Sequence, residues 1–216
     1  MAADLQQSSK AAVSARGLMP PYLVLRDFLG EDMVAGLLAH AMSHQSDFAP
    51  TGVFKDGVNP ARRISTSLRH LGPFRDVLRE KIFALLPTLV DALRVTPFAA
   101  SSLELELVAH GDGAFYKRHI DTQTAIYGDV DSLRILSGVY YFNAEPKAFS
   151  GGALRLYAIG GEARKDFSDI EPLRNSLLMF PSWASHEVRP VCCPSKAFIA
   201  SRFAINCWIH RKKLTS

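Results

Sequence analysis

The hydrophobic pattern of the chain changes near residue 100. Before this point, apolar residues recur at helical spacing in two stretches, 30–45 and 73–93, which predicts two amphipathic helices. Pro87 should kink or break the second helix, because a proline removes a backbone donor and clashes with the preceding turn. Short runs of β-forming residues at 21–29 and 61–68 predict strands beside these helices.

Beyond residue 100 the pattern becomes that of strands. Residues 102–110, SLELELVAH, alternate between apolar and polar, which indicates a half-buried strand. Further β-like runs follow, separated by turn-forming residues: 114–121, 133–143, 152–159, 176–181, 186–191 and 197–210. Helices followed by a series of short strands predict an α+β domain, an antiparallel sandwich or jelly roll with the helices packed on one sheet.

Length and composition fit one domain. At 216 residues, with 48% hydrophobic and 21% charged residues, the chain is long enough to bury a core. We expect residues 1–17 to be a disordered arm and residues 18–216 to form the domain, with helical support at about 30–95 and a jelly-roll core at about 101–210. The net charge of +4 is mild, so no nucleic-acid partner is expected.

The start of the chain and its cysteines indicate a cytoplasmic protein. Residues 1–17 lack the apolar core of a signal peptide, and no apolar run approaches the length of a membrane span. Three cysteines, of which Cys192 and Cys193 are adjacent, do not make a disulfide framework. A reducing compartment and no membrane partner are therefore expected.

His119 and Asp121 are the first candidate site residues. They lie two apart in a predicted strand, so their side chains should face the same side. His186 begins a later predicted strand. Two imidazoles and one carboxylate occupy one face of an octahedral ion and leave three positions open, which is the ligand set of non-haem Fe(II) oxygenases. An H-x-D triplet alone is a weak signal, however, and a solvent-facing pair is the alternative.

Arg202 is the second unusual feature. In the predicted strand 197–210, one face carries mainly apolar residues, and the other carries Phe198, Ala200, Arg202, Ala204, Asn206 and Trp208. Arg202 should therefore point into the interior between two alanines. A buried guanidinium without a partner is costly, and a carboxylate bound through two hydrogen bonds would satisfy it. A structural salt bridge, or an edge-strand arginine in water, is the alternative.

Five segments together resemble a known family: YKRHID, GVYYFN, SGGALRLY, SLLMFPSWASHEVRPV and RFAINCWIH. In order and approximate spacing they are similar to the prolyl-hydroxylase-like branch of the 2-oxoglutarate/Fe(II)-dependent dioxygenases. The resemblance covers about residues 103–210, and more loosely the helical half. It implies a double-stranded β-helix (jelly roll) and oxidative decarboxylation of 2-oxoglutarate to succinate and CO2, coupled to hydroxylation by O2. Ascorbate is a candidate reductant.

The resemblance also implies roles for individual residues. Iron would be held by His119, Asp121 and His186. Arg202 and Tyr141 would bind the distal carboxylate of 2-oxoglutarate, Trp208 would form an aromatic wall of that pocket, and Asn206 would face the same way. Gly151 and Gly152 serve a tight turn into the next strand.

Two departures from the family pattern stand out. Ala109 aligns with a position where related enzymes carry a tyrosine that contacts the cosubstrate, so one hydrogen bond is missing or comes from another residue. The loop between His186 and Arg202 is longer than usual and should bulge at the rim of the barrel. At the mouth, residues 122–134 form a candidate substrate loop, and Arg63 is a candidate rim residue.

The leading hypothesis is a hydroxylase of a prolyl or other side chain in a protein or peptide. The alternative enzyme acts on a free amino acid or small biosynthetic intermediate. From another class comes a non-catalytic metal-binding jelly-roll module, against which the anion-binding residues Arg202 and Tyr141 argue. Nucleic-acid demethylation would require a basic lid with stacking aromatic residues, and the mild charge argues against it.

Overall fold

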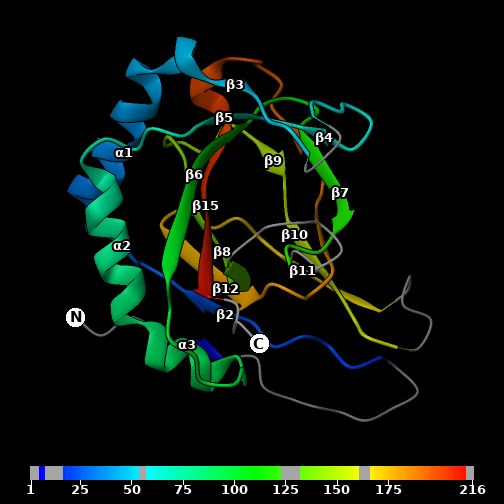
Figure 1. Ribbon diagram of the computed structural model, residues 1–216. Coiled ribbons are helices and arrows are strands. Elements are labelled where there is room, and N and C mark those ends of the chain that lie inside the picture. Colours follow the sequence, from blue (N-terminus) through cyan, green and yellow to red (C-terminus); the bar gives the residue numbers. More distant parts are fainter. Residues whose placement is uncertain (1–4, 8–16, 54–56, 123–131, 161–165, 213–216) are drawn as a thin grey trace.

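Two facing β-sheets, one of them covered by helices, make up the protein in the computed structural model (Figure 1). The structure describes residues 5–7, 17–53, 57–122, 132–160 and 166–212. The helices lie along the outer face of the larger sheet, and the smaller sheet faces the inner one. The predicted α+β jelly roll with helices on one sheet is confirmed.

The helices form where the apolar spacing predicts them. They are α1 (Glu31–Ser43), α2 (Phe74–Ala84) and α3 (Leu86–Ala92), with single-turn 3₁₀ helices η1 (Gln45–Asp47) and η3 (Phe198–Ala200). The break between α2 and α3 falls at Leu85, because Pro87 occupies the first turn of α3, where its missing N–H has no intrahelical role. Apolar side chains of all three helices join one core with the large sheet.

The large sheet is antiparallel and has the order β1-β2-β12-β8-β15-β6-β5-β3. Its strands are β1 (Leu5–Gln7), β2 (Leu23–Leu25), β3 (Ala49–Pro50), β5 (Thr66–Leu68), β6 (Ser102–His110), β8 (Ser132–Phe142), β12 (Ser176–Pro181) and β15 (Arg202–Lys212). On β15, Phe203, Ile205, Cys207 and Ile209 pack toward the helices, whereas Ala204 packs between the sheets. From Arg202 to Ile209 the expected alternation is therefore observed.

The smaller sheet has the order β11-β10-β13-β7-β4. Its strands are β4 (Arg63–Ile64), β7 (Phe115–His119), β10 (Leu154–Tyr157), β11 (Phe167–Ile170) and β13 (His186–Val188), and a separate pair joins β9 (Ser150–Gly151) to β14 (Val191–Cys192). The run predicted as one strand at 61–68 is divided between the two sheets, because the chain crosses from β4 to β5 at Ser65. β11 was not predicted.

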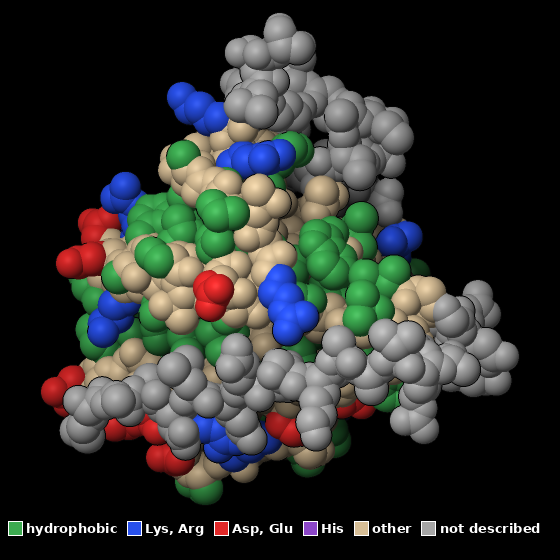
Figure 2. All heavy atoms as spheres, turned by 90° about the horizontal axis from the view of Figure 1, so that it is seen from below, with side chains coloured by type: hydrophobic (Ala, Val, Ile, Leu, Met, Phe, Trp, Pro, Cys, Tyr) green, Lys and Arg blue, Asp and Glu red, His purple; other side chains and the backbone are tan. Residues whose placement is uncertain are grey.

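The N-terminal residues and the surface show the following features. Of the arm predicted to be disordered, residues 1–4 and 8–16 lie outside the described residues, and Leu5–Gln7 pairs with β2. On the face seen in Figure 2, the coloured Lys and Arg side chains are interspersed with Asp and Glu among hydrophobic ones. Within the described ranges, none of the helices is long and apolar enough to span a membrane.

Candidate functional site

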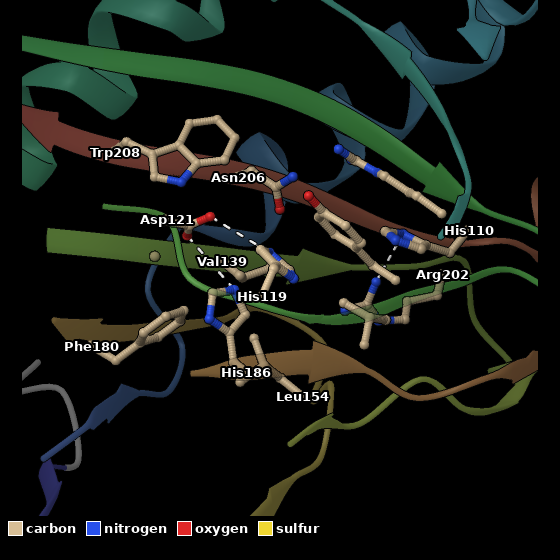
Figure 3. Close-up of a pocket in the computed structure, with 14 residues that line it drawn as sticks. His110, His119, Asp121, Val139, Leu154, Phe180, His186, Arg202, Asn206 and Trp208 are labelled. Atoms are coloured by element: carbon tan, nitrogen blue, oxygen red, sulfur yellow. Dashed lines mark hydrogen bonds and ion pairs between the residues drawn. The ribbon is translucent and has the colours of Figure 1, made fainter. Parts of the chain in front are cut away.

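His119, Asp121 and His186 converge between the two sheets (Figure 3). His119 ends β7 and is the register partner of His186, which begins β13, and their ring centroids are 4.2 Å apart. The Nε2 atoms of His119 and His186 lie 3.6 Å and 3.7 Å from the two carboxylate oxygens of Asp121. One nitrogen from each ring and one carboxylate oxygen therefore face a common point.

Asp121 reaches this point for a different reason than strand alternation. β7 ends at His119, and Asp121 lies beyond it, where its N–H donates to the Ser182 carbonyl at 3.0 Å. The Ser137 hydroxyl on β8 donates to the Asp121 carboxylate at 2.7 Å. The expected convergence is present, but contacts to two segments distant in sequence produce it. The only sign of this role in the sequence was that Ser137 is a polar residue within an otherwise apolar part of β8.

Backbone carbonyls orient both imidazoles. Nδ1–H of His119 donates to the Lys117 carbonyl at 2.8 Å, and Nδ1–H of His186 donates to the Ala184 carbonyl at 2.9 Å. Because a carbonyl only accepts, each ring carries its proton on Nδ1 and presents the Nε2 lone pair to the common point. Such outer bonds are typical of histidines that bind metals. No sequence pattern could have identified these main-chain partners.

The electrostatics favour a neutral imidazole beside a carboxylate anion. Burial and the neighbouring His119 lower the pKa of His186 to about 4. Burial by itself would raise the pKa of Asp121, but His186, His119 and the Ser137 hydroxyl outweigh it and hold that pKa well below its usual range. Neutral nitrogen donors and an ionised carboxylate are the protonation states that a divalent metal requires.

Arg202 points inward from the start of β15, as predicted. Its side chain is 1% exposed, its Nη1 donates to Nδ1 of His110 at 2.9 Å, and its guanidinium carbon lies 4.8 Å from the centre of the Tyr141 ring. Among the residues that the structure describes, no carboxylate pairs with this guanidinium, and its Nε has no hydrogen-bond partner. Within the described residues, the guanidinium of Arg202 therefore forms no salt bridge with an acidic side chain.

Tyr141 supplies a second unpaired polar atom. Its hydroxyl is buried beside the Arg202 guanidinium and has no hydrogen-bond partner of good geometry in the described part of the chain. Burial raises the pKa of this hydroxyl despite the adjacent Arg202, so it is a neutral donor. Two buried donors without acceptors at one place fit the carboxylate of an anionic ligand, because an unsatisfied buried polar group is costly. Tyr141 packs over Arg202 and does not line the inner cavity described below.

Gly152 makes room for the guanidinium. Its φ is +74° and that of Gly151 is +70°, which agrees with the tight turn expected at these positions. A Cβ at Gly152 would lie only 2.7 Å from Cδ of Arg202. The second glycine of this turn therefore also permits a close approach of the backbone to the arginine side chain.

His110 was missed by the sequence analysis, which considered Ala109 instead. Ala109 belongs to the core between the large sheet and the helices, whereas His110 faces the site and is the register partner of Arg202. Burial, together with the positive charges of Arg202 and Arg63, lowers the pKa of His110 well below its usual value. His110 is thus a neutral acceptor that holds Arg202 in place.

The segment before Arg202 also differs from expectation. Residues 198–200 form η3, so β15 begins at Arg202 rather than at 197. Phe198 does not share the inward face of Arg202, because its ring packs on Phe203 and Phe48, with centroids 5.2 Å and 5.1 Å away, on the helix side.

A small inner cavity and a wide outer cleft adjoin at the triad. The inner cavity, of about 40 Å³, is lined by the triad, Arg202, His110, Asn206 and Trp208 among others. The outer cleft, of about 1120 Å³, shares His119, Asp121, Tyr116 and Trp208 with it. Asn206 and Trp208 line the inner cavity, and Trp208 also lines the outer cleft.

Arg63, the candidate rim residue, is mostly buried and lines both the inner cavity and the outer cleft. It is 8% exposed, donates to Ser65 at 2.8 Å and lies 3.5 Å from Glu106. Its guanidinium also covers Tyr116, whose ring stacks on His119 with centroids 3.6 Å apart. Tyr116 had not been singled out. Most of the candidate substrate loop, residues 123–131, lies outside the described residues.

The donor set fits a ferrous ion and a dicarboxylate. Two oriented imidazoles and one carboxylate on one side of a common point match the ligand set of a non-haem Fe(II) centre with open positions. The two unpaired donors on Arg202 and Tyr141 fit a carboxylate held beside that centre.

Part of the chain is similar to a known family of proteins. Residues 105–210 match the 2OG-Fe(II) oxygenase superfamily. An uncharacterised PKHD-type hydroxylase of Synechocystis is 41% identical over 141 residues, which cover 63% of this chain and 45% of the relative. The chain thus spans less than half the length of that curated relative.

Solved structures share the fold. A Pseudomonas putida prolyl-4-hydroxylase superposes with a TM-score of 0.64 at 22% identity, over 89% of this chain and 94% of that one. A Trichoplax adhaerens prolyl hydroxylase, in complex with a peptide fragment of hypoxia inducible factor, gives a TM-score of 0.66 at 22% identity, over 88% and 83%.

Proposed function

Since residues 105–210 match the 2OG-Fe(II) oxygenase superfamily, we propose that the chain is an Fe(II)- and 2-oxoglutarate-dependent hydroxylase. The observation that carries the proposal is the combination of an oriented His-Asp-His triad with a buried arginine that lacks an acid partner among the described residues. A module that merely binds metal has no use for the second feature.

In this proposal the triad holds Fe(II) through Nε2 of His119, Nε2 of His186 and the carboxylate of Asp121. When bound, Fe(II), O2 and 2-oxoglutarate supply the oxidation, in which the cosubstrate becomes succinate and CO2 and a C–H bond becomes C–OH. The chain contributes orientation. The carbonyls of Lys117 and Ala184 fix the imidazole rings, and Ser137 fixes the carboxylate.

Arg202 and Tyr141 position the cosubstrate. A distal carboxylate would accept hydrogen bonds from the guanidinium and from the Tyr141 hydroxyl, which leaves neither donor unpaired. His110 occupies one edge of the guanidinium and so determines which of its N–H groups remain for the ligand. Burial excludes water from this pair and strengthens their interaction with an anion.

A protein or peptide is the proposed substrate. The outer cleft of about 1120 Å³ exceeds the roughly 300–1,000 Å³ that is usual for small ligands, and His119 and Asp121 of the triad line it. The solved Trichoplax adhaerens relative carries a peptide. A free amino acid or small intermediate remains the second candidate. Ascorbate as a reductant and a cytoplasmic location are parts of the same proposal.

The test is turnover of 2-oxoglutarate by the full chain. With Fe(II) and O2 the protein should form succinate, Asp121→Ala should abolish this, and Arg202→Ala should raise the cosubstrate concentration required. Asp169→Ala and Arg155→Ala, which remove a surface ion pair on β11 and β10, are the matched controls and should leave turnover unchanged. Full turnover by Asp121→Ala would overturn the iron assignment. Host proteins that gain one oxygen atom, measured by mass spectrometry, would identify the substrate class.

A further inference from the structure

A second group of metal-ligating side chains lies on the outer side of the large sheet. His40 and His44 are one turn apart at the end of α1, and His70 lies in the turn between β5 and α2. One ring nitrogen of each lies within 4.8 Å of the others. The spacing of four residues places the two helical imidazoles on one face, with ring centroids 4.2 Å apart, the same separation as in the pair His119 and His186.

Backbone carbonyls orient the two helical rings. Nδ1–H of His44 donates to the His40 carbonyl at 2.9 Å, and Nε2–H of His40 donates to the His70 carbonyl at 2.9 Å. Each ring therefore keeps one nitrogen with a free lone pair. This is the outer bonding that metal-binding histidines usually show, and it repeats the arrangement of His119 and His186 in the first site.

The turn that carries His70 is built to approach His40 closely. Gly72 has a φ of +52°, which favours glycine, and a Cβ there would lie 3.2 Å from Cε1 of His40. Phe74 packs edge-on against the His40 ring at 5.7 Å. His40 is only 9% exposed, whereas His70 is exposed, so an ion could enter from solvent and His70 could rotate to complete its coordination.

We propose that His40, His44 and His70 bind a divalent cation of the zinc class, separate from the iron triad. Imidazole is a favoured ligand of zinc, nickel and copper, and three imidazoles leave a fourth position for water. The negative end of the α1 dipole also favours a cation at this place. Magnesium and calcium, which prefer oxygen ligands, should bind far more weakly.

The proposed ion would connect the end of α1 to the β5–α2 turn. The chain runs from His44 directly into η1 and β3, where Asp47, Ala49 and Pro50 line the outer cleft of the first site. An ion at the three histidines would therefore hold one wall of that cleft without touching the triad. The expected benefit is stability of the fold rather than chemistry.

Zinc binding to a chain without the iron ligands tests the proposal. In His119→Ala/Asp121→Ala/His186→Ala, calorimetric titration with zinc chloride should show one equivalent bound and a raised unfolding temperature. Adding His44→Gln or His70→Gln should weaken zinc binding roughly tenfold or more, because loss of a direct ligand should cost at least as much as loss of an outer partner. His210→Gln, outside both groups, should change nothing.

Native mass spectrometry of the otherwise unaltered chain gives an independent reading. It should retain two zinc ions, and His44→Gln should retain one, with 2-oxoglutarate turnover by Fe(II) preserved. Absence of zinc binding to the triad-free chain, or binding that His44→Gln and His70→Gln leave unchanged, would overturn the proposal. Because these readings do not depend on turnover, they stand apart from the test of the hydroxylase function.

Discussion

Arg202 and His110 are directly opposite each other on β15 and β6, and Nη1 of the arginine donates to Nδ1 of the histidine at 2.9 Å. This bond is buried, and the histidine is held neutral by burial and by two positive neighbours. The site therefore uses an uncharged acceptor to orient a guanidinium without cancelling its charge. An acid in place of His110 would compete with the proposed cosubstrate for Arg202.

We expect His110→Phe to raise the KM for 2-oxoglutarate about tenfold. Loss of a hydrogen bond to a charged group costs roughly 1.5–3 kcal/mol. Without His110 the guanidinium of Arg202 is no longer held in place, so part of this cost should weaken the binding of 2-oxoglutarate. His110→Gln, whose amide oxygen can still accept from Arg202, should be affected less. The measurement is succinate formation as a function of cosubstrate concentration. Equal KM values for the Phe variant and the unaltered protein would show that His110 does not position Arg202.

The same histidine predicts a pH dependence of stability. The pKa of His110 is lowered in the folded protein from its ordinary value of about 6.5. Below about pH 6.5 the unfolded chain therefore binds one more proton than the folded protein. The contribution of neutral His110 to stability is thus complete above about pH 6.5 and is lost as the pH falls below it, by at most about 1.4 kcal/mol per pH unit. Denaturant unfolding measured above and below pH 6.5 should show a smaller loss of unfolding free energy for His110→Gln than for the unaltered protein. Parallel curves for the two proteins would contradict this assignment.

Gly152→Ala should destabilise the fold and displace Arg202. A residue with a side chain at φ +74° costs about 1–2 kcal/mol, and the added Cβ would also press on Cδ of Arg202 at 2.7 Å. Gly160 is the matched control, because it has the same φ of +74° and none of the described residues lies within 4 Å of its Cβ position. Gly152→Ala and Gly160→Ala should both lower the unfolding temperature, because each places a side chain at a positive φ. Only Gly152→Ala should also weaken 2-oxoglutarate binding. Equal effects would leave no role for the close approach to Arg202.

The features that could be predicted from the sequence are those that depend on interactions between residues close together in the chain. The amphipathic helices, the break at Pro87 and the inward face of β15 depend on the local pattern of residues, and the structure shows them. The site positions of His119, His186 and Arg202 also follow from strands that can be identified locally. The structure brings these residues together with Asp121 as the family resemblance implied.

The parts that were missed depend on pairing between distant segments. His110 faces Arg202 because of the register of β6 against β15, and a shift of one residue would have placed Ala109 there. Asp121 is held by Ser137 and the Ser182 carbonyl, which a reading along one strand does not reveal. The crossing of the chain between sheets at Ser65 likewise has no local signal.

Ser137 should act as a positioning residue for the proposed metal. Its hydroxyl donates to the Asp121 carboxylate at 2.7 Å, so Ser137→Ala leaves that ligand free to rotate. Loss of such an outer bond typically weakens metal binding about 10–100-fold. Ser132→Ala is the control on the same strand, since the Ser132 hydroxyl bonds His210 instead. Titration of Fe(II) under anaerobic conditions measures both, and an unchanged iron affinity in Ser137→Ala would remove this role.

Tyr141→Phe should separate stability from binding. The Tyr141 hydroxyl is buried without a hydrogen-bond partner among the described residues, so its removal should leave the free energy of unfolding unchanged or raise it by about 1 kcal/mol. If that hydroxyl donates to the cosubstrate carboxylate, the same change should weaken 2-oxoglutarate binding about tenfold. Denaturant unfolding and anaerobic calorimetry with Fe(II) present measure the two effects. Tyr140→Phe is the control, because its hydroxyl already donates to Asn175 at 3.0 Å, so this variant should lose stability but bind 2-oxoglutarate normally. A Tyr141→Phe protein that is less stable and binds the cosubstrate as before would mean that the hydroxyl has a structural partner instead of a ligand.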